Sequence, residues 1–196
     1  MVIVISNTHK INAEPAIVNH LFEEGLEVFH LRKSHFSYNE TKSYIQNIRQ
    51  EHHSKIALHH HHGLVDELSL KRIHHTSNSR KELSQEDLNT QYNSKKRIST
   101  SVHSLSELES ISPCFEYCFF GPVFNSISKK GYLSIIDWEK FHLPEKERSR
   151  VVALGGIDET NMVMVKELGF ESIALLGAIW HNNDPIKTFI RIRKKW

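Results

Sequence analysis

The most regular feature of the chain is a series of short apolar runs, rich in β-branched residues and separated by polar or amphipathic stretches. Runs of this kind that are almost continuously apolar are typical of parallel strands covered on both faces. We interpret eight of them as strands, at residues 2–6, 28–32, 55–59, 72–75, 97–102, 117–122, 151–156 and 172–177.

The stretches between these runs carry helical spacing and helix-end signals. Apolar positions predict helices over residues 13–24 and 160–168. Gly25 and Gly169 follow them directly, where a helix end commonly adopts the left-handed conformation. An Asp-Pro pair at 184–185 predicts the start of the last helix, with an acidic cap and a proline at the first helical position.

Strands that alternate with helices imply a parallel sheet. Eight such units, with no linker that divides residues 1–196, favour a single-domain closed (β/α)8 TIM barrel over an open doubly wound sheet. The open sheet remains the alternative because residues 77–93 are weakly periodic. The chain is long enough for one sizeable core, although a full barrel typically has about 250 residues.

Composition places the chain among ordinary globular proteins, with 39% hydrophobic and 24% charged residues. The formal net charge of +2 is too small to indicate a nucleic-acid partner. Two short basic stretches, at 95–97 and 191–195, lack interleaved aromatic residues, and we interpret both as solvated surface. We therefore expect no nucleic-acid partner.

Cysteine usage and hydropathy bear on location. Cys114 and Cys118 are too few for a disulfide framework, and their spacing matches no standard zinc pair. No segment approaches the roughly 18 apolar residues of a membrane span. The run at 2–5 lacks the basic flank and the small-residue cleavage site of a signal peptide. We expect reduced thiols and a cytoplasmic protein that does not bind membranes.

Glycine-containing turns follow the last two predicted strands. Gly155 and Gly156 follow the seventh strand, and Leu176 and Gly177 follow the eighth. In a barrel of this class these loops commonly hold phosphate, because glycine lets backbone N–H groups approach an anion. The alternative is that the glycines make only tight turns. Two such loops on consecutive strands favour phosphate binding.

Cationic residues close the second predicted strand. If Phe29 and Leu31 face the helices, alternation sends His30 and Arg32 toward the barrel interior, with Lys33 directly after them. An inward guanidinium is costly without an anionic partner. We therefore predict that this segment contacts an anionic ligand. A salt bridge from Arg32 to an acidic loop residue is the alternative.

Two further segments carry candidate chemistry. Ser101 and His103 share one face at the end of the fifth strand, where a histidine can transfer protons near neutral pH. The loop after the sixth strand contains Ser126, Ser128 and Lys129, which can hydrogen-bond and neutralise a phosphate. A structural histidine and a plain surface loop are the alternatives.

A run of four histidines, at 59–62, suggests metal chemistry but gives weak evidence for it. In an extended chain neighbouring side chains face opposite sides, so at most two of the four converge, and His74 or His75 could add one ligand. No carboxylate or cysteine at ligand spacing accompanies them. We therefore favour partly exposed histidines and predict no metal site.

Taken together, these segments resemble the thiamine-phosphate synthase and TenI family. The matching segments appear in family order over nearly the whole chain: Leu31-Arg32-Lys33, Ile73-His74, Ser101-Val102-His103-Ser104, Gly121-Pro122-Val123-Phe124 with Ser128-Lys129-Lys130, Ala153-Leu154-Gly155-Gly156-Ile157, and Ala174 to Ile179. The resemblance implies a (β/α)8 barrel that acts in thiamine biosynthesis as a homodimer or larger homo-oligomer.

The synthase branch of this family joins hydroxymethylpyrimidine pyrophosphate to a thiazole phosphate and releases pyrophosphate, with Mg²⁺ as cofactor. The resemblance implies that Arg32 and Lys129 stabilise the departing pyrophosphate with help from Ser101, and that the backbones of Gly156 and Gly177 hold the thiazole phosphate. Ser126 and Ser128 stand where the family has threonines that contact the ligands.

The chain departs from the synthase pattern at the metal ligands. The family's Asn-Asp pair aligns with His59-His60, and the next acidic position falls in residues 76–79, which contain no acid. Mg²⁺ prefers oxygen ligands, and pyrophosphate leaves poorly without charge neutralisation. We therefore predict that the chain does not bind Mg²⁺ and that synthase chemistry is disfavoured.

The TenI branch aromatises a thiazole phosphate tautomer by a proton shift that needs no metal, and the resemblance gives His103 the role of acid–base. We therefore favour a tautomerase that acts on thiazole phosphate without a cofactor. The first alternative is the Mg²⁺-dependent synthase, with the pyrimidine pyrophosphate as a second substrate. A second alternative is a non-catalytic phosphate-ligand-binding or regulatory protein.

Overall fold

The computed structural model describes residues 1–125, 133–134, 136–137 and 140–196. The strands are β1 (Val2–Ile5), β2 (Val28–Leu31), β3 (Ile56–Leu58), β4 (Arg72–His75), β5 (Arg97–Val102), β6 (Phe115–Phe120), β7 (Val151–Leu154) and β8 (Ser172–Leu175). They form one closed barrel in chain order, and all pairs are parallel, including the β1–β8 pair that closes it. The predicted (β/α)8 barrel is therefore confirmed.

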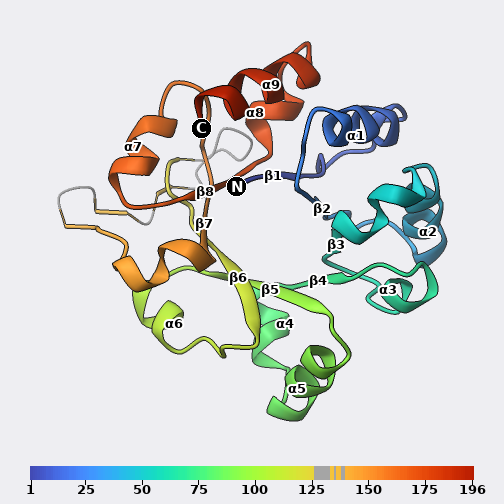
Figure 1. Cartoon of the computed structure of the whole chain (residues 1–196), viewed down its shortest axis with the longest axis horizontal. Helices are drawn as coiled ribbons and strands as arrows, with labels where there is room; N and C mark the ends of the chain where they lie inside the picture. Colours follow the sequence, from blue (N-terminus) through green and yellow to red (C-terminus); the bar gives the residue numbers. More distant parts are fainter. Residues whose placement is uncertain (126–132, 135, 138–139) are drawn as a thin grey trace.

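Helices cover the outside of the strand ring (Figure 1). They are α1 (Glu14–Glu23), α2 (Tyr38–Gln46), α3 (Leu64–Glu67), α4 (Ser77–Lys81), α5 (Gln85–Asn93), α6 (Leu105–Glu109), α7 (Met162–Glu167), α8 (Gly177–Trp180) and α9 (Pro185–Lys195), with 3₁₀ helices η1 (Gln50–Lys55) and η2 (Glu145–Arg150). No helix in the described part of the chain is long and apolar enough to cross a membrane.

Alternation along each strand divides the apolar residues into two cores. Val2 and Val4 of β1 pack outward with the helices in the larger core. Ile3 and Ile5 point inward and belong to a smaller cluster inside the barrel. Burial on both faces explains why the strands read as continuous apolar runs.

The helix-end signals act as the sequence predicts. Gly25 and Gly169 have φ values of 87° and 94°, in the left-handed region that favours glycine. Asp184 caps α9 by accepting a hydrogen bond from the Lys187 amide at 3.0 Å.

The weak periodicity of residues 77–93 has a local cause. This stretch forms two short helices, α4 and α5, and Ser84 caps the second of them through a capping box with Asp87. Because residues 82–84 between the two helices are not helical, no single 3.6-residue pattern runs through the stretch. The break lies outside the strand ring and leaves the barrel closed.

Candidate active site at the carboxyl ends of the strands

A cavity of about 240 Å³ opens at the carboxyl ends of the strands, where ligand sites lie in barrels of this class. The predicted ligand-binding residues that line it are Arg32, Ser101, His103, Gly155, Gly156, Leu176 and Gly177. These residues lie at or just after the carboxyl ends of β2, β5, β7 and β8. The structure thus brings the cationic segment and the glycine turns to one cavity.

Arg32 lies at this cavity directly after β2, with an exposed side chain. Ser6 fixes its backbone: the Ser6 hydroxyl accepts a hydrogen bond from the Arg32 amide at 2.9 Å and lies 3.1 Å from the Arg32 carbonyl oxygen. The guanidinium makes no ion pair or hydrogen bond with another residue in the described part of the chain. It is therefore available to an anionic ligand.

His103 is held in one tautomer by its neighbours. Its Nδ1 lies 2.6 Å from the carbonyl oxygen of Gly121, and a carbonyl only accepts. Nδ1 therefore carries the proton and donates it, which leaves Nε2 of the neutral ring with a free lone pair. The Glu107 carboxylate accepts a hydrogen bond from the His103 amide at 2.7 Å, which fixes the backbone as well.

The turn after β7 requires glycine. Gly155 and Gly156 have φ values of 106° and 65°, and a Cβ atom on Gly156 would lie 2.3 Å from the carbonyl oxygen of Asn125. The amides of both glycines donate no hydrogen bond to another residue of the described ranges. Free N–H groups at a cavity wall suit an anionic oxygen.

The turn after β8 is tied to the first strand. Leu176 and Gly177 line the cavity, and α8 begins at Gly177. The Trp180 indole donates a hydrogen bond to the carbonyl oxygen of Ile5 at 2.7 Å. This bond anchors the turn across the seam where β8 meets β1.

Lys33 does not line the cavity, although we predicted a ligand contact for it. It is 2% exposed and forms a buried ion pair with Glu14 of α1. Its ammonium also donates a hydrogen bond to the carbonyl oxygen of His9 at 2.7 Å. The alternation that we used for His30 and Arg32 sends the next residue outward, toward α1.

His30 points into the barrel as alternation predicts, but it lies beneath the cavity and not in its wall. Its Nδ1 is 2.9 Å from Nε2 of His59, and its Nε2 is 2.6 Å from the hydroxyl of Tyr117. The His59 and His74 rings stack with centroids 4.0 Å apart, and both line the cavity. The imidazoles of His59 and His74 therefore line the cavity, and the His30 ring lies beneath them.

Sequence reasoning missed this three-histidine cluster. We considered the histidines at 59–62 together, yet His59 alone of that run joins the cluster, and its partners are His30 and His74. The available signal was inward alternation in three consecutive strands, since β2, β3 and β4 each place one histidine on the inner face near its carboxyl end.

Burial keeps these imidazoles neutral. It lowers the pKa of His30 to about 3, and the Arg72 guanidinium adds to the shift. Burial also lowers the pKa of His59 and of His74 well below the usual value, with the neighbouring imidazoles adding to the shift. The pKa of Tyr117 rises to about 12 because the phenol is buried. All four groups are uncharged at neutral pH.

Ser101 connects the histidines to the cavity. Its hydroxyl is 3.0 Å from Nε2 of His74, and the hydroxyl of Ser99 is 2.9 Å from Nδ1 of the same ring. Ser77 also lines the cavity and donates a hydrogen bond to the carbonyl oxygen of Ser101 at 3.1 Å. We did not select Ser77 from the sequence, although its place directly after the fourth predicted strand was a signal.

The residues present do not fit Mg²⁺. No carboxylate lines the cavity within the described ranges, and His59, Thr76 and Ser77 line it after β3 and β4. Mg²⁺ requires oxygen ligands and is usually held through carboxylates. The donor set here is imidazole nitrogen and hydroxyl. Ser126, Ser128 and Lys129, which we also predicted to bind ligand, lie outside the described residues.

Curated relatives match about half of this chain. One, a thiamine-phosphate synthase of Prochlorococcus marinus, is 37% identical over 93 residues, which are 46% of this chain and 26% of the relative. Another, from Anoxybacillus flavithermus and of the same name, is 33% identical over 90 residues, or 43% and 40%. The matches thus span less than half the length of these relatives. Their names favour the synthase branch over the tautomerase that we preferred from the sequence.

Solved structures match over nearly the full length. A thiamine phosphate pyrophosphorylase from Bacteroides thetaiotaomicron has a TM-score of 0.75 and 25% identity, covering 99% of this chain and 95% of that one. One from Pyrococcus furiosus has a TM-score of 0.73 and 19% identity, with coverage of 98% and 93%, and shows the same fold. The family model described as thiamine monophosphate synthase (TMP-TENI) matches residues 2–179. The chain therefore belongs to the thiamine monophosphate synthase (TMP-TENI) family.

Proposed function

We propose that the chain is a thiamine-phosphate synthase that joins hydroxymethylpyrimidine pyrophosphate to a thiazole phosphate. The observation that carries the proposal is the cavity itself, in which the unpaired guanidinium of Arg32 and the free amides of Gly155 and Gly156 line the same space. Such a cavity can hold two anionic groups at once. The names of the curated relatives support the synthase branch.

In this proposal the pyrimidine carbon–oxygen bond breaks and its electron pair leaves with the pyrophosphate. The thiazole nitrogen then donates its lone pair to the pyrimidine methylene carbon and forms the new carbon–nitrogen bond. Arg32 and the Ser101 hydroxyl donate charge-assisted hydrogen bonds to the departing oxygens. The amides after β7 and the turn at Gly177 hold the thiazole phosphate, so that the two substrates meet in a fixed orientation.

The apolar part of the cavity wall supports this chemistry. Ile5, Phe119, Leu154 and Ile157 line the cavity beside the polar groups. An apolar wall limits the water that can reach a reactive pyrimidine cation and divert it to the alcohol. The free Nε2 of His103 can accept a hydrogen bond from a ligand at the cavity edge.

Tautomerase activity is the second candidate, and one observation favours it: no carboxylate lines the cavity among the described residues, so the usual Mg²⁺ ligands are missing. A proton shift on a thiazole phosphate needs a positioned base and a phosphate site. His103 has a free lone pair on Nε2 and could supply the base.

The deciding experiment supplies both substrates to the purified chain with a chelator, Mg²⁺, Mn²⁺ or Zn²⁺, and measures thiamine phosphate and pyrophosphate together. We expect both products in equal amounts in at least one condition. A chain that instead aromatises the thiazole tautomer without the pyrimidine substrate is the tautomerase. Tight binding of thiazole phosphate without any turnover identifies the non-catalytic alternative.

His103→Ala separates the two enzymatic candidates further. A tautomerase that uses this histidine should lose about 10²–10⁴-fold in turnover while it keeps its affinity for thiazole phosphate. A synthase should keep pyrophosphate release, since no step of the condensation takes a proton from the substrates at this position. The two outcomes differ in kcat, which single-turnover measurements report directly.

A further inference from the structure

We propose that His30, His59 and His74 bind a divalent transition-metal ion, with Zn²⁺ as the expected ion, at the floor of the cavity. One ring nitrogen of each residue lies within 4.8 Å of the other two, and each side chain is more than nine-tenths buried. This inference does not depend on which reaction the chain catalyses.

The spacing of the nitrogens is close to that of ligands on one ion. Two imidazole nitrogens bound to tetrahedral zinc at 2.0–2.1 Å lie about 3.3 Å apart. Nδ1 of His30 and Nε2 of His59 lie 2.9 Å apart, joined by a hydrogen bond. A small outward shift of the two rings makes room for an ion between them, provided that the shared proton moves to the other nitrogen of the ring that carries it, so that both rings stay neutral. His74 stacks on His59, so its ring must turn, and its Nε2 must exchange the Ser101 hydroxyl for the ion, to direct that nitrogen to the same point.

The surroundings resemble the outer shell of a metal site. A ligating histidine usually hydrogen-bonds through its other ring nitrogen, which fixes its orientation. The Tyr117 hydroxyl takes this place at Nε2 of His30, and the Ser99 hydroxyl takes it at Nδ1 of His74. Nδ1 of His59 is buried with no hydrogen-bond partner in the described residues. The cluster is therefore not a fully satisfied structural network.

The donor set selects the kind of ion. Neutral imidazoles suit zinc and other late first-row metals, whereas Mg²⁺ requires oxygen. Three neutral ligands leave the charge of the ion uncompensated, and no carboxylate lines the cavity among the described residues. Since His59 and His74 face the cavity, the remaining coordination position opens toward it. A phosphate or pyrophosphate oxygen would bind there and supply the missing negative charge.

The test uses the full-length chain without an affinity tag, because the sequence contains 15 histidines and a tag would add more. The chain is stripped with a chelator and titrated with Zn²⁺ and with Co²⁺. We expect one tightly bound ion per chain, visible absorption bands typical of four-coordinate cobalt, and X-ray absorption that reports three nitrogen neighbours. Inorganic pyrophosphate should change the cobalt bands by occupying the fourth position.

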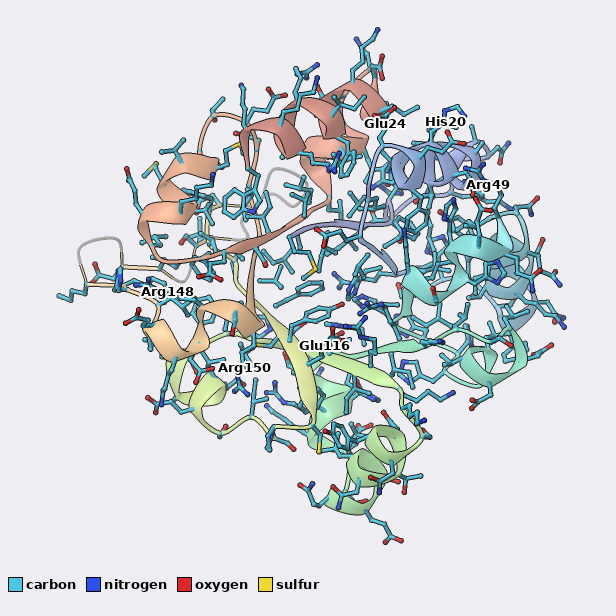
Figure 2. The ribbon with its side chains drawn as sticks, viewed as in Figure 1. His20, Glu24, Arg49, Glu116, Arg148 and Arg150 are labelled. Carbon is cyan, nitrogen blue, oxygen red and sulfur yellow. The ribbon has the colours of Figure 1, made fainter. Side chains whose placement is uncertain are left out.

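Matched variants locate the site. His30→Gln, His59→Gln and His74→Gln should each weaken Zn²⁺ binding by more than about 100-fold, since the loss of an outer-shell partner alone costs 10–100-fold. His60→Gln is the control beside the cluster. His20→Gln is the control on α1, where the side chain lies on the outer face of the helix (Figure 2). Both controls should bind Zn²⁺ like the unaltered chain.

The proposal is overturned if the unaltered chain binds neither ion more tightly than about 100 μM. It is also overturned if the three cluster variants bind as tightly as the controls, which would assign the ion to surface histidines. If a cluster variant fails to fold, X-ray absorption on the unaltered chain still decides. Fewer than three nitrogen neighbours there rejects the site. An absent pyrophosphate effect rejects the open fourth position.

Discussion

The two sides of the barrel mouth are built from opposite chemistry. On the side of β2 to β5, which we call the histidine side, the inward residues near the cavity are Arg32, His59, His74 and Ser101. On the side of β7, β8 and β1, which we call the glycine side, the cavity wall is aliphatic and ends in turns of glycine. One side offers charge and nitrogen, and the other offers apolar surface and backbone N–H groups.

This difference indicates a division of labour between two anions. A pyrophosphate that leaves with a growing charge needs cationic groups, which are worth most where charge develops. A phosphate that only anchors its substrate keeps the same charge throughout the reaction. Uncharged backbone amides can hold it by hydrogen bonds. We therefore expect changes on the histidine side to affect pyrophosphate, and changes on the glycine side to affect thiazole phosphate.

The largest effect should be the loss of stability in Lys33→Met. This variant tests whether Lys33 stabilises the fold or contributes to ligand binding on the histidine side. The substitution leaves Glu14 buried without its ion-pair partner and should cost about 3–5 kcal/mol of unfolding free energy, measured by urea denaturation. Lys42→Met breaks the exposed pair with Glu67 and should cost at most about 1 kcal/mol.

The alternative outcome for Lys33→Met is a stable protein with weak ligand binding. That result would restore the ligand contact that we predicted from the sequence. The double variant Glu14→Leu/Lys33→Met removes both charges together. Most of the lost stability should return in it, because neither partner is then left buried alone.

Gly177→Asp should weaken phosphate binding on the glycine side. A carboxylate at this turn brings like charge and bulk against a bound phosphate, and such a contact costs several kcal/mol. We expect thiazole phosphate to bind about 10²–10³-fold more weakly by calorimetry, with little change for pyrophosphate. Gly63→Asp is the matched control, because Gly63 is exposed at the start of α3 and away from the cavity. Equal losses for the two anions would contradict the division.

Arg32→Ala should weaken pyrophosphate binding on the histidine side and leave thiazole phosphate binding largely unchanged. The loss of charge-assisted hydrogen bonds costs about 1.5–3 kcal/mol, which weakens pyrophosphate binding by about 10–100-fold. Arg32→Lys keeps the charge without the planar fork and should give an intermediate loss. Arg49→Ala removes an exposed arginine that pairs with Glu23 on the outer surface (Figure 2). It should change neither affinity.

Strand order and helix ends are predictable from the sequence because they follow from local rules. Runs of apolar residues gave the strands within a few residues, and the glycines after α1 and α7 marked where those helices end. The glycine side was predictable for the same reason, since Gly155 and Gly156 are adjacent in the chain and their backbone conformation is a local property.

Alternation predicts that the three histidines point inward, but it does not predict that they meet, because their meeting depends on register between strands. His30, His59 and His74 meet only because β2, β3 and β4 pair with a particular stagger. The burial of the Lys33 side chain depends on its ion pair with Glu14 of α1, and no pattern near residue 33 predicts that partner. The predicted and observed sites therefore differ where a side chain depends on a contact with a residue that is distant in the sequence.

The last prediction is a pH dependence of stability that comes from the histidine side. His30 has a pKa of about 3 in the folded chain and about 6.5 when unfolded. Between these values the unfolded state takes up a proton that the folded state does not bind. Its contribution to stability is therefore complete above pH 6.5 and decreases as the pH falls, by about 1.4 kcal/mol per pH unit.

Urea denaturation at a series of pH values, with a chelator present, measures this slope. His30→Gln should make the slope between pH 6 and pH 4 shallower by about 1.4 kcal/mol per pH unit, because glutamine takes up no proton in either state. His20→Gln is the control at an exposed position of α1, away from the cavity, and should leave the slope unchanged. Parallel curves for His30→Gln and the unaltered chain would mean that His30 is protonated while folded. Its ring could then not be a neutral member of the cavity floor.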